Sequence, residues 1–231
     1  MNKTTVFIIG GAVILLTAGI TQFFSTRSAI SPTIVTATSA AEQNGSIATN
    51  SITPTTNVNT QKNLVTHPLP LVSGDSIASW DFKGAYTDNP ELVAKAQSEI
   101  QRLSIQLDTA TSSAMILSVS IANQYELLGN GKKQYEYLGR AVRENPENGL
   151  PWHNLGVLME KLGAYKTARS AHEKSTLVQS ELKFYHYAYI DFLITRMKDD
   201  TVRIEKAFAF AENNIGQDPY LTELRTEWMK P

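Results

Sequence analysis

The chain changes its pattern of hydrophobic and polar positions twice along its length. Residues 6–24 are almost continuously apolar, and residues 25–67 show no apolar period of 2 or 3.6. From Pro90 onward, apolar residues recur at steps of three and four. These patterns are typical of a membrane-spanning helix, a non-globular segment and a set of amphipathic helices, respectively. The sequence therefore predicts three regions with different physical roles.

The apolar segment 6–24 reads VFIIGGAVILLTAGITQFF and lies in a stretch without charge between Lys3 and Arg27. As a helix it would be about 28 Å long, close to the hydrocarbon thickness of about 30 Å. We therefore expect a transmembrane helix that follows a tail of residues 1–5. A cleaved signal peptide is the alternative, because it also begins with a cationic stretch before an apolar run. The best small residues for cleavage, at 37–41, lie well beyond the apolar run.

The orientation of this helix depends on its flanking charges. Lys3 and Arg27 nearly cancel, so the free amino group and the short tail favour a cytoplasmic N-terminus. We expect a single-pass membrane protein with its C-terminal domain outside the cytoplasm. The alternative is a secreted protein.

Residues 25–67 are rich in Ser, Thr, Ala and Asn, and their charged residues are Arg27, Glu42 and Lys62. Such a composition buries too little apolar area to offset the cost of backbone ordering, about 1–2 kcal/mol per residue. We expect a disordered linker.

The first amphipathic helix begins at a clear signal. Asn89 is a favoured cap residue, and Pro90 suits the first helical position. One stripe of the helix is apolar, through Leu92, Ala96, Ile100, Leu103 and Leu107. We therefore read residues 68–114 as an irregular lead-in followed by a capping helix.

A shift of 34 residues aligns residues 115–148 with residues 149–182. The aligned pairs are Ile121 with Leu155, Ala122 with Gly156, Tyr125 with Met159, Gly129 with Gly163, Leu138 with His172, and Ala141 with Ser175. The second window reads WHNLGVLM from Trp152, followed by Gly163, Tyr165 and Ala168. It resembles the tetratricopeptide repeat pattern W-x2-L-G-x2-Y followed by A-x3-F. Departures from the pattern are His172 at the aromatic position, Ser180 at the proline, Ser118 at the tryptophan and Gln134 at the alanine.

The resemblance implies an all-α fold, a short α-solenoid of antiparallel helix pairs. Small residues in the pattern let paired helices approach, and large ones fill the space beside them. Residues 183–218 form a third, stretched unit with extra residues in the turn at 197–201, and residues 219–231 form a closing helix. The residues with expected structural roles in the repeats are Ile121, Ala122, Tyr125, Gly129, Leu138, Ala141, Pro146, Trp152, Leu155, Gly156, Gly163, Tyr165 and Ala168.

In tetratricopeptide repeat proteins the first helix of each repeat lines a concave surface that receives a peptide. The resemblance therefore implies a set of partner contacts, which we name the predicted groove residues. They are Asn123, Glu126, His153, Asn154, Val157, Glu160, Tyr185, His186 and Tyr189. His153 and His186 could face each other across adjacent repeats, where we read them as polar groove residues and predict no metal site. Val119 stands where members that bind chaperone carboxylates have a lysine, so we do not expect that ligand.

Composition excludes several classes of function. The net charge of −1 leaves no basic surplus for nucleic acid, and the absence of cysteine excludes thiolate chemistry and disulfides. Residues 129–133, GNGKK, lack the spacing of a phosphate-binding loop, and we find no catalytic motif. We predict no cofactor and no small-molecule substrate, and we do not expect an enzyme. The sequence favours a membrane-tethered module that binds another protein or peptide at the cell envelope. The alternative is a secreted or surface protein whose repeats support an unrecognised enzymatic activity.

Overall fold

The computed structural model describes residues 66–230. The predicted tail 1–5, the predicted transmembrane helix 6–24 and nearly all of the predicted linker 25–67 lie outside these residues. Within the described part, no helix has the length and apolarity needed to cross a membrane.

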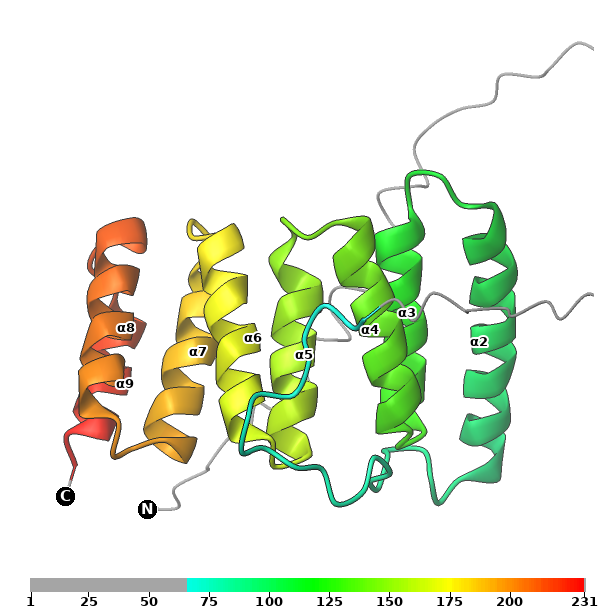
Figure 1. Cartoon of the computed structure of the whole chain (residues 1–231), viewed down its shortest axis with the longest axis horizontal. Coiled ribbons are helices and arrows are strands. Elements are labelled where there is room, and N and C mark those ends of the chain that lie inside the picture. The colour runs from blue at the N-terminus through cyan, green and yellow to red at the C-terminus, as the bar shows by residue number, and fades with distance from the viewer. Residues whose placement is uncertain (1–65, 231) are drawn as a thin grey trace, which may run out of the picture. The chain divides into compact units, whose positions relative to one another are not determined.

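The described residues form eight helices and no β-strand, which confirms the all-α prediction for this part of the chain. The helices are α2 (Pro90–Thr109), α3 (Ala114–Leu127), α4 (Gly131–Glu144), α5 (Gly149–Lys161), α6 (Tyr165–Val178), α7 (Lys183–Arg196), α8 (Thr201–Ile215) and α9 (Pro219–Trp228). They stand side by side in one row (Figure 1), and from α2 to α8 each helix packs against the next one in sequence. Helix α9 returns to pack against α7.

The row is repeat-like and consistent with tetratricopeptide-type packing. Ala114, Gly149 and Lys183 begin α3, α5 and α7, so successive starts are 35 and 34 residues apart. Helices α4, α6 and α8 begin 34 and 36 residues apart. The turn at 197–200 between α7 and α8 is one residue longer than the turns at 128–130 and 162–164.

Local chemistry explains where the helices begin and end. The side chain of Asn89 accepts hydrogen bonds from the backbone N–H groups of Glu91 and Leu92, at 3.1 and 3.2 Å, at the start of α2. Gly129 and Gly163, which are 34 residues apart, both have φ near +77° just beyond the ends of α3 and α5. A glycine adopts this left-handed conformation without a steric cost, so the same signal ends both helices.

The core runs the length of the row. Leu138, Leu155, Ile190 and Phe208 are fully buried between successive helices. A smaller cluster, built from Leu103, Leu107, Ala114 and Ile121, joins α2 to α3. At the other end α9 buries Leu221 and Leu224. Apolar side chains of α2 and α9 therefore cover the two ends of the row.

An irregular segment, residues 67–86, is held on the helices along its length, and we call it the strap (Figure 1, cyan). The pattern places the linker's end at residue 67, yet the His67 Nε2–H donates to the backbone oxygen of Tyr135 at 2.9 Å. Leu69 is buried in the main core. Asp75 accepts hydrogen bonds from the backbone N–H and the hydroxyl of Thr167, at 2.6 and 2.7 Å. The strap thus binds α4 and α6 before the chain reaches α2.

The end of the strap is fixed by backbone hydrogen bonds to the turn between α3 and α4. The Phe82 N–H donates to the Gly129 oxygen at 3.0 Å, and the Gly131 N–H donates to the Trp80 oxygen at 2.9 Å. Because these bonds use main-chain groups, no particular side chains mark them in the sequence.

Candidate functional site

The predicted groove residues lie on three helices, α3, α5 and α7, and they divide into two groups. Those on α3 and α5 are half-buried: Asn123, Glu126, His153, Asn154, Val157 and Glu160. Those on α7 are buried: Tyr185, His186 and Tyr189. The first group, apart from His153, whose ring packs against Phe184, is accessible enough to meet a partner in the folded chain, and the second is not.

The three α7 residues lie inside the helix packing because α7 packs against α6 on one side and α8 on the other. His186 is 1% exposed, and its Nε2–H donates to the backbone oxygen of Ser180 at 2.7 Å. Within residues 66–230 the Tyr189 hydroxyl has no hydrogen-bond partner, and burial raises its pKa to about 12. A Cβ at Gly149 would lie 2.5 Å from the Tyr185 ring, which shows how closely that ring packs on α5. The aromatic residues that α7 leaves accessible are Phe184, which is 50% exposed, and half-buried Tyr187.

The accessible residues of α3, α5 and α7 form a surface that we call the α3–α5–α7 face. It consists of Asn123, Glu126, Asn154, Val157, Glu160, Phe184, Tyr187 and Asp191. Two ion pairs cross it: Lys161 to Glu126 at 2.7 Å and Arg196 to Glu160 at 2.8 Å. Since Glu126 and Glu160 are 34 residues apart, the same ion pair recurs from one helix pair to the next. These glutamates therefore already have cationic partners within the chain.

Beneath Phe184 lies a pair of histidines. The ring centroids of His153 and His172 are 5.5 Å apart, and Phe184 covers His153 with a centroid distance of 4.7 Å. Both nitrogens of His172 and the Nδ1 of His153 are buried without a hydrogen-bond partner in the part of the chain that the structure describes. Burial lowers the pKa of His153 to about 4, and burial together with His153 lowers the pKa of His172 to about 3. Both imidazoles are therefore neutral at pH 7.

This pair differs from the one that the sequence suggests. His153 pairs with His172 on α6, whereas His186 packs near Phe210 at 5.5 Å. The signal for His172 is its place in the repeat: it occupies an aromatic position of the pattern, and such a position is usually buried. Because His172 is 2% exposed, it belongs to the core beneath the face.

A third group of side chains lies where α7 meets α9. The rings of Tyr187 and Tyr220 meet edge to face, with centroids 4.7 Å apart. Lys183 forms an ion pair of 2.8 Å with Asp218, which lowers the pKa of Asp218 to about 2. Asp191 is exposed, and no ion pair to it occurs within the described residues. Partial desolvation of its carboxyl, and then the nearby Glu160, raise the pKa of Asp191, while Arg196 opposes this shift.

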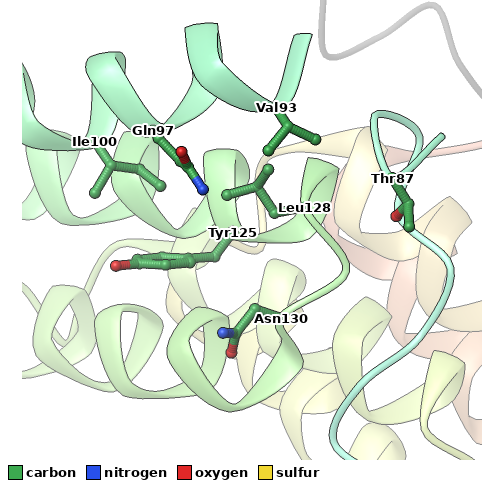
Figure 2. A pocket seen from close by; sticks show the side chains of 7 residues that line it. All are labelled: Thr87, Val93, Gln97, Ile100, Tyr125, Leu128 and Asn130. Atoms are coloured by element: carbon green, nitrogen blue, oxygen red, sulfur yellow. The ribbon is translucent and has the colours of Figure 1, made fainter. Parts of the chain in front are cut away.

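A cavity of about 460 Å³ lies between α2 and the end of α3 (Figure 2). Its lining residues are Thr87, Val93, Gln97, Ile100, Tyr125, Leu128 and Asn130. The lining contains none of the predicted groove residues and no charged side chain. Thr87 and Asn130 accept hydrogen bonds from the backbone N–H groups of Gly84 and Lys133, so their oxygens help to hold a loop and a helix start. No cluster of three or more potential metal ligands occurs within residues 66–230.

Comparison of the chain with protein-family models, with curated proteins and with solved structures finds no match.

Proposed function

We propose that the chain is a membrane-tethered interaction module with tetratricopeptide-type repeats. In this proposal the α3–α5–α7 face binds a segment of a partner protein and recruits that partner at the cell envelope. The membrane tether is residues 6–24.

The observation that supports this proposal most is that the strap covers one part of the row of helices and leaves the α3–α5–α7 face accessible. The strap covers parts of α4 and α6 with hydrogen bonds and with the buried side chain of Leu69. Among the described residues, no hydrogen bond or ion pair joins the strap to the eight residues of the α3–α5–α7 face. The strap reaches the edge of this face where Lys161, the partner of Glu126, lies 4.6 Å from the Phe82 ring centroid. On that face the large side chain of Phe184 is half exposed, and Val157 and Asn154 on α5 are half-buried. An accessible aromatic residue on a face that also carries amide and apolar groups is a typical anchor for a protein partner.

A co-purification experiment tests the proposal with the full-length chain in detergent solution. We expect Phe184→Ser combined with Val157→Ser to lower the recovery of specifically bound proteins at least tenfold, because it removes the apolar anchors of the face. Val202→Ser is the matched control, since Val202 is 66% exposed on α8.

Circular dichroism melting of each variant shows whether the fold is kept. Equal recovery by folded wild type and folded double variant would remove the α3–α5–α7 face as the binding surface.

A further inference from the structure

The charges around Asp191 do not balance. Lys183 is paired with Asp218, and Arg196 is paired with Glu160. Asp191 stands on α7 between these two pairs and has no ion pair of its own within the described residues. Burial raises the pKa of Tyr220, and the nearby carboxylates of Asp191 and of Glu223, on the neighbouring helix α9, raise it further. This end of the α3–α5–α7 face therefore carries an excess of negative charge.

Two tyrosine rings lie beside this carboxylate. Tyr187 is one helical turn before Asp191 on α7, so their side chains are neighbours on the helix surface. Tyr220 meets the Tyr187 ring at 4.7 Å, and 43% of Tyr220 is exposed. Faces of aromatic rings attract cations, and a guanidinium group both stacks on such rings and pairs with a carboxylate.

The chain already uses this chemistry internally. Arg225 lies 4.2 Å from the ring centroid of Phe208 and is paired with Glu205 and Glu212 at 2.8 and 3.1 Å. Arg196 lies 5.9 Å from the Tyr165 ring while it pairs with Glu160. At Tyr187, Tyr220 and Asp191 the rings and the carboxylate are present, but the cation of the chain is already engaged with Asp218.

The distance along α7 relates this group to the apolar anchor of the face. Phe184 and Asp191 are seven residues apart and lie on one stripe of the helix, which corresponds to about 10 Å at 1.5 Å per residue. Three residues of a polyproline II segment span about 9 Å, and its three residues per turn place side chains three positions apart on the same side. A segment lying along α7 would therefore reach both places with side chains three positions apart.

We propose that Tyr187, Tyr220 and Asp191 bind an arginine side chain of the partner protein, and that this arginine lies three positions from an apolar residue that packs on Phe184. The proposal rests on the proposed function and specifies the partner segment. It also links binding to pH, because protonation of Asp191 removes the charge that the guanidinium meets.

Peptide binding to the full-length chain in detergent micelles, measured by surface plasmon resonance, tests this directly. The probe is acetyl-Gly-Leu-Ala-Ala-Arg-Gly-amide, and its control carries citrulline, which keeps the shape of arginine without the charge. We expect the arginine peptide to bind about tenfold more tightly, the combined effect of a cation–π contact and an ion pair. A peptide with Leu directly before Arg should lose most of this advantage.

Matched protein variants locate the effect. Asp191→Asn should reduce the preference for the arginine peptide to about threefold, because the ion pair is lost while the cation–π contact with the tyrosine rings remains. Asp199→Asn changes another exposed acid, in the turn between α7 and α8, and should leave the tenfold difference intact. Equal binding of the two peptides by wild type, or a full tenfold difference that persists in Asp191→Asn, would overturn the arginine site.

The two proposals fail in distinguishable ways. If the double variant at Phe184 and Val157 loses its co-purified partner while Asp191→Asn keeps it, and the two peptides bind equally, the face binds a partner without an arginine site. If the double variant also keeps its partner, the proposed function itself is wrong.

Discussion

At the scale of single residues, His153 and His172 account for three of the seven buried side-chain polar atoms that have no hydrogen-bond partner in the described residues. Their three buried, unpartnered nitrogens each lose hydrogen bonds to water when the chain folds, at a cost of about 1–3 kcal/mol for a group left unsatisfied. The cost is tolerated because the rings also fill space: the ring of His172 packs against Gly156 on one side and Phe192 on the other. The pair therefore makes the stability of the fold depend on pH.

The sign of this dependence follows from the pKa values of the two histidines. Both are lowered by folding, to about 4 and about 3, from about 6.5 in an unfolded chain. As the pH falls, the unfolded state binds protons at these histidines before the folded state does. The free energy of unfolding therefore keeps its full value above about pH 6.5 and decreases as the pH drops from there toward 3. Each histidine contributes a slope of up to roughly 1.4 kcal/mol per pH unit.

His172→Phe should reduce the loss of stability between pH 7 and pH 5 and should raise stability at pH 7, because a ring without polar atoms replaces the unsatisfied one. Urea unfolding at the two pH values measures both effects. His67→Gln is the control, because it measures how much a third histidine, whose pKa burial also lowers, contributes to the pH dependence of stability. If the free energy of unfolding still differs between pH 7 and pH 5 by the same amount in His172→Phe, protonation of another group causes the loss of stability.

Gly156 permits the close approach of α5 and α6. A Cβ at this position would lie 2.7 Å from the ring atoms of His172, and a packed ring cannot move aside as a flexible side-chain end can. Gly156→Ala should therefore destabilise the protein by about 1–3 kcal/mol, despite a gain of up to about 1 kcal/mol in helix propensity.

A double-mutant cycle isolates this contact. In a His172→Ala background the ring is absent, so Gly156→Ala should become neutral or stabilising. The same destabilisation in both backgrounds, measured by urea unfolding, would mean that His172 does not set the spacing of the helices.

Sequence reasoning at residue scale works where a position has one possible role. Gly129 and Gly163 end helices by their backbone conformation, and Trp152 and Leu155 are buried, as their places in the pattern require. It works less well for Tyr185 and Tyr189, because α7 has neighbours on two sides and a helical period does not tell which stripe stays exposed. For this reason the repeat pattern indicates Tyr185 rather than the accessible Phe184, which is one position before it.

At the scale of elements, the strap is the feature that the sequence pattern describes least. Residues 67–86 have no helical or strand period, and much of their attachment uses main-chain groups such as Phe82 N–H and Gly129 oxygen. Only its contacts in the folded chain distinguish such a segment from a linker. The helices, in contrast, can be predicted from capping residues such as Asn89 and from regularly spaced apolar residues.

Asp75→Ala should release the middle of the strap from α6. The substitution removes both hydrogen bonds from Thr167 to the Asp75 carboxylate, whereas the bond from Val72 N–H to the Thr167 hydroxyl remains possible. We expect faster hydrogen exchange at residues 72–75 and at the Thr167 amide, with unchanged exchange in α8. Asp81→Ala is the control, since its exposed side chain makes no hydrogen bond among the described residues. Unchanged exchange at Thr167 would show that Asp75 does not hold the strap.

At the scale of the whole molecule, the described part is a row in which most contacts join neighbouring helices. The stability of such an arrangement is approximately a sum of local terms, and its ends need covers for their apolar sides. Helix α9 is one cover, through Leu221 and Leu224.

Removal of residues 217–231, which include α9, should therefore destabilise the neighbouring helices α7 and α8 more than α3 and α4 at the other end of the row. We expect hydrogen exchange to rise at least tenfold in α7 and α8, while α3 and α4 change little. A uniform rise along all helices would mean that the row unfolds as one cooperative unit and that α9 is not a local cover.

The central claim is that the α3–α5–α7 face meets a partner protein, and site-specific photo-crosslinking tests it most directly. A benzophenone amino acid is placed in the full-length chain at position 184 on the face, or at position 202 on α8, where the native side chain is more exposed (66% against 50%). In irradiated cells we expect a discrete covalent adduct with a partner protein from position 184 and none from position 202. No adduct from position 184, or the same adducts from both positions, would contradict the account.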